Sequence, residues 1–236
     1  MANTLASIGF DFTDPAQFQE RMLELAAGAI ERLSCPPGDY AIWRSRTGAE
    51  IWFHLGVFGT EDDARDIHGL TPFFEGASDV AVEITERVQR PDDNPFEGQL
   101  VARLCLARRR ADQPDAPVAG TPADTRFTFD AIDFAAHADR PLPFVCQARL
   151  VALASSIRTI TVGEPAGVFS TTRLSGETLE IRRLQNEASG GRFVALVLDC
   201  AGTTIDVVAE AGLVPGDLEP GAAIEVDGRL FGRLMD

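Results

Sequence analysis

Short runs of alternating apolar and polar residues fill most of the chain from Phe144 to the end, and glycine-containing turns separate them. A period of two is typical of β-strands that bury one face, and strands spaced in this way form sandwiches or barrels. The pattern therefore predicts an all-β region. We expect its strands at 144–154, 158–162, 179–184, 192–200, 203–209 and 223–234.

The last part of this region resembles a known fold. RFVALVLDC and TTIDVVAE predict a hairpin around Ala201 and Gly202, and glycines punctuate the closing segment EPGAAIEVDGRLFGRL. In this shape the end of the chain resembles the end of OB-type barrels. The resemblance implies a C-terminal OB-like β-barrel, and we expect residues 142–236 to form it as a separate domain.

The first part of the chain combines one helix with strands. Ile8, Phe10 and Phe12 alternate in a predicted strand over 5–12. Asp14 is suited to cap a helix that starts at Pro15, and apolar residues then recur at helical spacing. The prolines and the glycine at 36–38 predict that this helix ends near residue 35.

Two alternating runs, DYAIWR and GAEIWFHLG, predict a β-hairpin, and further strands are expected at 79–87 and 99–106. The segment LTPFFEG before them is expected to be a turn. The order strand, helix, hairpin and strand resembles the βαβββ module of the glyoxalase and extradiol dioxygenase superfamily. We therefore predict an α+β, mostly β protein, in which domain 1–141 places one long helix on an antiparallel sheet.

Every basic residue is an arginine, which excludes several reaction classes. Walker-type phosphate loops, Schiff-base enzymes and protein kinases need a lysine that this chain lacks. The net charge of −15 repels phosphate backbones and anionic membranes, so nucleic acid is an unfavoured partner. Because there is neither a signal peptide nor an apolar run of membrane-spanning length, we expect a cytoplasmic protein without a membrane partner.

Glu50 and His54 are the candidate catalytic residues. They share one face of a predicted strand with Trp52, and members of the superfamily resembled commonly bind a divalent metal through histidine and glutamate on such a face. At a rise of ~3.3 Å per residue, about 13 Å of strand separates the two side chains, which is too far for one metal ion. With only three histidines in the chain, we expect no metal site and no cofactor.

Trp52, Phe73 and Phe74 are the candidate binding residues. In an alternating strand one of the two adjacent phenylalanines would face outward, and an exposed aromatic side chain would mark a partner or homo-oligomer surface.

Three functional hypotheses remain open at this point. The scarcity of chemically useful residues favours a non-catalytic binding or interaction protein with a protein or small-molecule partner. The second is a small-molecule enzyme, with or without a metal, that uses Glu50, Trp52 and His54. The third is a nucleic-acid accessory protein that uses exposed aromatics and arginines of the barrel.

Overall fold

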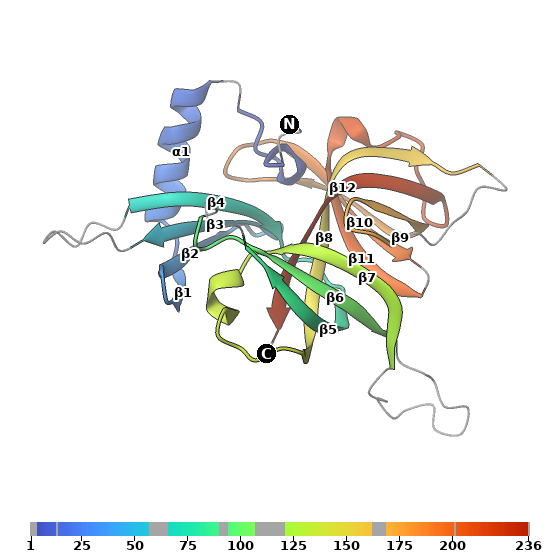
Figure 1. The fold of residues 1–236 in the computed structure, drawn as a ribbon. Coiled ribbons are helices and arrows are strands. Elements are labelled where there is room, and N and C mark those ends of the chain that lie inside the picture. Colours follow the sequence, from blue (N-terminus) through green and yellow to red (C-terminus); the bar gives the residue numbers. More distant parts are fainter. Residues whose placement is uncertain are drawn as a thin grey trace, which may run out of the picture.

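The computed structural model describes residues 4–12, 14–56, 66–89, 94–106, 121–161, 169–200 and 202–235. In chain order its elements are η1 (Ala6–Ile8), α1 (Pro15–Ala27), β1 (Glu31–Cys35), β2 (Gly38–Arg44), β3 (Ala49–Gly56), β4 (Asp66–Phe74), β5 (Asp79–Val88), β6 (Gln99–Leu106), β7 (Thr121–Ala131), η2 (Phe134–His137), β8 (Phe144–Thr159), β9 (Arg173–Gln185), β10 (Arg192–Cys200), β11 (Thr203–Glu210), η3 (Ala211–Leu213) and β12 (Ala223–Met235) (Figure 1).

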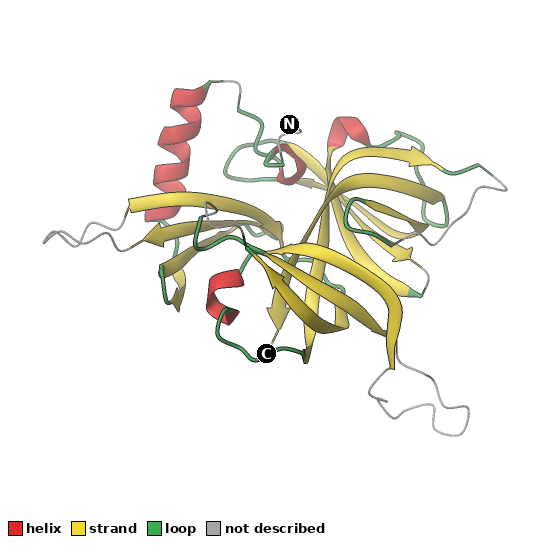
Figure 2. Cartoon of the chain, viewed as in Figure 1, coloured by secondary structure: helices red, strands yellow, loops and turns green. Residues whose placement is uncertain are grey.

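The strands form two sheets, and α1 is the one α-helix of the described residues (Figure 2). The small sheet has the order β1-β2-β3-β4 and is antiparallel throughout. The large sheet has the order β10-β11-β8-β5-β6-β7-β12-β9, and β9 pairs again with β10, so its pairings close into a circuit. The prediction of a mostly β, α+β protein is confirmed.

The large sheet contains the same arrangement twice. Strands β5, β6 and β7 are antiparallel neighbours, η2 follows, and β8 then pairs with β5. Strands β9, β10 and β11 repeat this order with η3 and with β12, which pairs with β9. The third strand of the first set, β7, pairs in parallel with β12 of the second set. The third strand of the second set, β11, pairs in parallel with β8 of the first set. The antiparallel pair β8–β12 therefore lies at a pseudo-two-fold axis.

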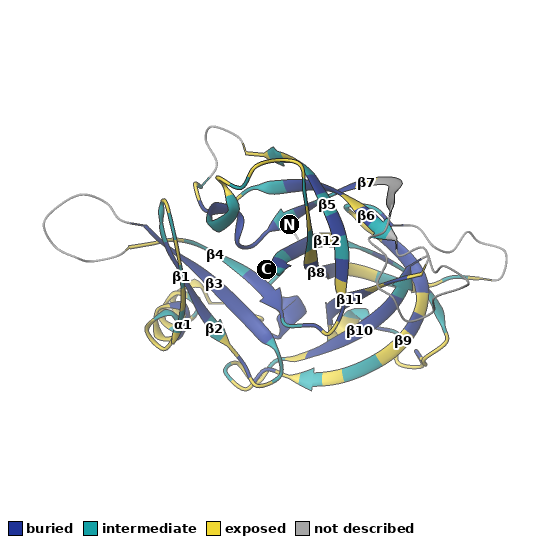
Figure 3. Ribbon diagram, turned by 90° about the horizontal axis from the view of Figure 1, so that it is seen from below, coloured by how far each residue is buried: buried dark blue, intermediate teal, exposed yellow. Residues whose placement is uncertain are grey.

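Two apolar clusters stabilise these layers. One consists of the side chains that alternate along the eight strands of the large sheet and point to its inside, such as Val82, Leu150 and Leu196. The other lies between the outer face of that sheet and the small sheet, and it extends through the small sheet to Met22 and Leu25 of α1. Figure 3 shows the result, with β3 buried along its length and most of α1 exposed.

The N-terminal prediction was wrong in two elements. Residues 5–12 do not form a strand: η1 ends at Ile8, the following Gly9 adopts a left-handed φ of 85°, and the Phe10 amide donates back to the Leu5 carbonyl. Thus the strand that begins a βαβββ module is missing from the described residues. Helix α1 starts at Pro15 with an Asp14 cap, as predicted, but it ends at Ala27 instead of near residue 35, because residues 31–35 pair with β2.

Two further segments also differ from the prediction. Residues 70–74 of LTPFFEG belong to strand β4, which pairs with β3 up to Phe74, so they do not form a turn. The strand predicted at 144–154 and the first two residues of the one predicted at 158–162 belong to one strand, β8, which has a register shift in its pairing with β12. Residues 160 and 161 are not in a strand, and residue 162 lies outside the described residues. The predicted hairpin of β2 and β3 and the strands predicted at 99–106 and 192–200 are confirmed.

Hydrogen-bonded strand pairs cross the expected domain boundary at 141/142, because β8 pairs with β5 and β12 pairs with β7. The division into residues 1–141 and 142–236 remains a prediction. None of the helices in the described ranges has the length and hydrophobicity that a membrane crossing requires.

Candidate functional site

Glu50, Trp52 and His54 lie on the face of β3 that is turned toward the large sheet. Their exposed fractions are 0%, 0% and 1%, so all three are enclosed between the two sheets. The strand register places Tyr40 of β2 beside His54 and Arg44 of β2 beside Glu50. The three predicted residues thus share one buried layer with an aromatic and a cationic neighbour.

Glu50 is fixed by two strong donors. The Trp52 indole Nε1 donates to one carboxylate oxygen at 2.8 Å, and the Arg44 guanidinium Nε donates to the other at 2.6 Å. Burial raises the pKa of Glu50, and the hydrogen bond from Trp52 and the charge of Arg44 oppose that rise. Arg44 also contacts Glu75 at 3.0 Å, so Glu50 belongs to an ion-pair network at the junction of the sheets.

His54 is held on both ring nitrogens. The Asn94 amide nitrogen lies 3.1 Å from Nδ1, and the Thr71 hydroxyl lies 3.2 Å from Nε2. Because Asn94 Oδ1 accepts from the Phe96 amide, its Nδ2 is the donor, and Nδ1 of His54 therefore accepts. The ring stacks on Phe96 at 5.3 Å, and burial lowers the pKa of His54 to about 4. His54 is therefore a neutral side chain at pH 7.

Gly69 makes this arrangement possible. It is the strand partner of His54, and a Cβ at this position would lie 3.0 Å from Nδ1 of His54 and 2.8 Å from the Asn94 amide nitrogen. A larger residue would therefore push Asn94 away from the imidazole.

Tyr40 completes the buried layer. Its hydroxyl donates to the Phe96 carbonyl at 2.7 Å and accepts from the Ala135 amide at 3.0 Å. Its pKa is raised, mainly by burial. Tyr40 thus joins the small sheet to η2 and to the loop before β6.

Phe73 and Phe74 are both buried, with exposed fractions of 1% and 0%. Phe73 is the strand partner of Glu50, and the ring of Phe74 meets the edge of Phe193 in the large sheet. Neither ring offers a surface to a partner in this conformation, and the same holds for Trp52.

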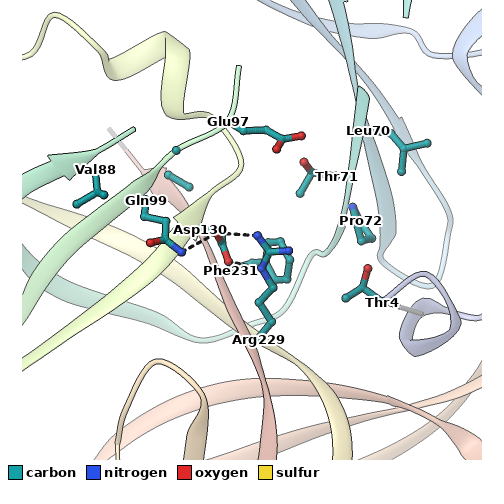
Figure 4. Close-up of a pocket in the computed structure, with 12 residues that line it drawn as sticks. Thr4, Leu70, Thr71, Pro72, Val88, Glu97, Gln99, Asp130, Arg229 and Phe231 are labelled. Carbon is teal, nitrogen blue, oxygen red and sulfur yellow. Dashed lines mark hydrogen bonds and ion pairs between the residues drawn. The ribbon is translucent and has the colours of Figure 1, made fainter. Parts of the chain in front are cut away.

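A polar cleft opens beside the buried layer, between the edge strand β4 and the large sheet (Figure 4). Its volume is about 370 Å³. Leu70, Thr71 and Pro72 of β4 form one wall, and Pro72 is tolerated because β4 is an edge strand, with no strand paired to this side in the described part of the chain. Further lining residues are Thr4, Val88, Glu97, Gly98, Gln99, Asp130, Ala131, Arg229 and Phe231.

Asp130 and Arg229 form the charged centre of the cleft. The guanidinium donates through Nε at 2.6 Å and through Nη2 at 2.9 Å to the two carboxylate oxygens, and Gln99 donates to the same carboxylate at 3.2 Å. The hydrogen bond to Asp130 raises the pKa of Arg229. The Arg229 side chain is 59% exposed and its guanidinium lies 5.2 Å from the Phe231 ring.

Two residues that line the cleft also contact His54 of the buried layer. Thr71 lines the cleft and contacts His54, and Glu97 lines the cleft with one carboxylate oxygen 3.7 Å from Nδ1 of His54. The imidazole of His54 therefore packs behind the residues that form the cleft wall and is not exposed in the cleft.

No family model, no curated protein and no solved structure matches this chain. Its function therefore follows only from the chemistry of the residues above. Across the described ranges, no group of three or more His, Cys, Asp or Glu side chains is arranged to hold a metal ion.

Sequence patterns did not single out Gln99 of β6 and Asp130 of β7, and they pointed to Arg229 of β12 only as one of the barrel arginines of the nucleic-acid hypothesis. Each lies in an alternating run where a polar residue is ordinary. One signal was present: the pattern arginine, leucine, apolar residue occurs at 149–151 and again at 229–231, at equivalent places of the two long strands.

Proposed function

We propose that the chain is a non-catalytic binding protein and that the polar cleft is its ligand site. The proposal rests on one contrast. Glu50 and His54, the residues suited to acid–base chemistry, are enclosed and hydrogen-bonded within the fold, whereas Arg229 is 59% exposed in the cleft. A general acid or base must reach its substrate within hydrogen-bonding distance, and the enclosed pair has no such access.

The cleft selects a ligand that carries both donors and acceptors. Arg229 is paired with Asp130, and a guanidinium that is 59% exposed can exchange this partner for a carboxylate or carbonyl group of a ligand. Asp130 and Glu97 offer acceptors for an ammonium or amide group. One positive and two negative side chains give the cleft a net charge of −1, which disfavours a dianion. A volume of about 370 Å³ suits a small zwitterionic or peptide-like ligand.

The OB-like barrel stays part of this proposal. Strands β8 to β12 pair in a circuit of five, β8-β11-β10-β9-β12 and back to β8, which supports the resemblance of residues 142–236 to an OB barrel. A nucleic-acid role gains little from it, since single-strand binding needs exposed aromatics. Phe193 and Phe231 are 0% and 3% exposed.

Calorimetric titration with three linear probes tests the proposal: 4-aminobutanoate as the zwitterion, glutarate as the dianion and putrescine as the dication. We expect saturable binding of 4-aminobutanoate, weakened about tenfold or more by Arg229→Gln. Arg173→Gln is the matched control, because Arg173 forms an exposed Nε contact to Asp227 at 2.9 Å outside the cleft. If none of the probes binds, the cleft is not a site for a small zwitterion, and if Arg229→Gln has no effect on a probe that binds, the cleft is not the ligand site.

A further inference from the structure

A row of four side chains crosses the centre of the large sheet. Phe231 of β12 pairs with Val151 of β8. Each of these two residues has an aspartate as its partner on the neighbouring parallel strand. Asp130 of β7 pairs with Phe231, and Asp206 of β11 pairs with Val151. The row is therefore symmetric about the β8–β12 pair, and Asp130 and Asp206 occupy equivalent ends of it.

The arginines near the two ends are equivalent as well. Arg229 precedes Phe231 by two residues, so the two side chains point to the same face of β12. Arg149 precedes Val151 by two residues in the same way on β8. Each guanidinium uses Nε and Nη2 on an aspartate: Arg229 on Asp130, and Arg149 on Asp79 at 2.8 and 3.1 Å. The two ends thus carry the same pair of side-chain types.

The Asp206 end is filled by the chain itself. The segment from Glu75 to Asp79 connects the two sheets and covers Asp206, which is fully buried. The Ser78 amide donates to Asp206 at 2.8 Å, and Gly76 packs so closely that a Cβ there would overlap the carboxylate.

The same segment also supplies anions to the arginine. Asp79 forms the two hydrogen bonds to Arg149, and a carboxylate oxygen of Glu75 lies 3.8 Å from its Nη1. One peptide segment therefore contacts both charged groups of this end: a main-chain amide donates to Oδ2 of Asp206, and acidic side chains pair with Arg149. Among the described residues Oδ1 of Asp206 has no hydrogen-bond partner, and it lies 3.9 Å from Nη2 of Arg182.

At the Asp130 end the equivalent space is the open cleft. No peptide lies there among the described residues, and the Gln99 side-chain amide donates to Asp130 where a main-chain amide serves Asp206. The Arg229 guanidinium donates to Asp130 (Figure 4) and occupies the position that a group of a bound ligand would take beside this carboxylate.

We infer that the cleft binds a short peptide segment that combines a glycine with an acidic residue, in the manner in which the Asp206 end holds residues 75–79. A main-chain amide of the peptide donates to Asp130, its acidic side chain pairs with Arg229, and its glycine lies against the Asp130 carboxylate. Glu97, on the cleft wall, disfavours a run of acids, so the acidic residue lies on the Arg229 side. This inference rests on the proposed function and narrows its ligand class.

The test uses the peptide acetyl-Gln-Gly-Ala-Ser-Asp-amide in calorimetric titration of the full chain. It copies residues 75–79 with glutamine in place of Glu75, so that it carries one acidic residue, the equivalent of Asp79. We expect one saturable site. Arg229→Gln should weaken it about tenfold or more, and Arg173→Gln should leave it unchanged. The peptide acetyl-Gln-Ala-Ala-Ser-Asp-amide should bind about tenfold more weakly, because its added Cβ meets the carboxylate as it would at Gly76.

Four outcomes overturn the inference. Binding that is insensitive to Arg229→Gln would place the peptide elsewhere, and equal affinity of the alanine peptide would remove the analogy with residues 75–79. If 4-aminobutanoate binds at Arg229 and the peptide does not, the peptide inference fails while the cleft remains a ligand site. If neither binds, both proposals fail together.

Discussion

Lowering the pH should destabilise the fold through His54. The side chain is buried and neutral, and its pKa is about 4 against an ordinary value of 6.5. Between these two values the unfolded chain binds a proton at this position and the folded chain does not. Stability contributed by the neutral imidazole is therefore fully present above pH 6.5 and is lost as the pH falls toward 4.

Linkage gives the size of this loss. For a group with a pKa of 6.5 in the unfolded chain and about 4 in the fold, the free energy of unfolding drops by about 2 kcal/mol from pH 7 to pH 5, and by ~3 kcal/mol once the folded form also titrates. Glu50 acts in the opposite sense, since a raised folded pKa stabilises the fold at low pH. A comparison with a His54 variant separates the two contributions.

Urea denaturation at pH 7 and pH 5 measures the effect in the native chain, in His54→Gln and in His68→Gln. His68 lies at an exposed position of β4, and its removal takes away the smaller, electrostatic cause of the low His54 pKa and leaves burial, the larger one. The native chain and His68→Gln should lose about 2 kcal/mol more than His54→Gln between the two pH values. An NMR titration of His54 in the native chain gives the pKa directly and does not depend on the variant folding. An equal pH dependence in all three chains, or a His54 pKa near 6.5, would refute the reasoning.

Substitutions at three positions, Tyr40, Gly76 and Glu50, test the packing at the junction of the sheets, each by urea denaturation at pH 7. Tyr40→Phe should cost about 2 kcal/mol, because it leaves a buried carbonyl and a buried amide without a partner; an unchanged stability would contradict the role of the hydroxyl. Gly76→Ala should cost ~1–3 kcal/mol through its clash with Asp206, while Gly216→Ala, with open space around it, should change stability by less than about 1 kcal/mol; equal effects would contradict the close approach. Glu50→Gln should cost less than Glu50→Ala, since an amide oxygen still accepts from the indole at 2.8 Å; the reverse order would contradict that hydrogen bond.

Local sequence patterns predicted the strands well where two neighbours in sequence also pair in space. The hairpin of β2 and β3 and the strand β10 follow from alternation and turn residues alone. Pairing with distant or overlapping partners decided the rest. Residues 31–35 have an apolar spacing that suits a helix, yet they form β1 because the edge of β2 accepts them.

The segment at 5–12 shows a second reason for failure. Its alternating residues would suit a strand, but Ile8 and Phe10 are buried together at the contact of both sheets, where a turn at Gly9 fits and a strand would find no ladder. A left-handed φ at Gly9 is not evident from alternation. The close contact of residues 9 and 191 that fixes this turn joins opposite ends of the chain.

The candidate site illustrates the same limit. Glu50, Trp52 and His54 were recognisable as one strand face, but whether that face meets solvent or a second sheet depends on the whole fold. The cleft is assembled from side chains of β4, β6, β7 and β12, and the closed circuit of pairings brings them together. Only the repeated arginine–leucine pattern of β8 and β12 hinted at the internal symmetry that relates the open and the filled ends.

The most direct test of the account is an NMR titration that follows the Arg229 Nε–H signal and the backbone amides of Gly98 and Gln99 while acetyl-Gln-Gly-Ala-Ser-Asp-amide is added. The account predicts saturable shifts at these three positions with one common affinity, as the Arg229 guanidinium exchanges Asp130 for the peptide carboxylate. Signals that stay unchanged at these positions, with shifts confined to other parts of the surface or absent throughout, would contradict it.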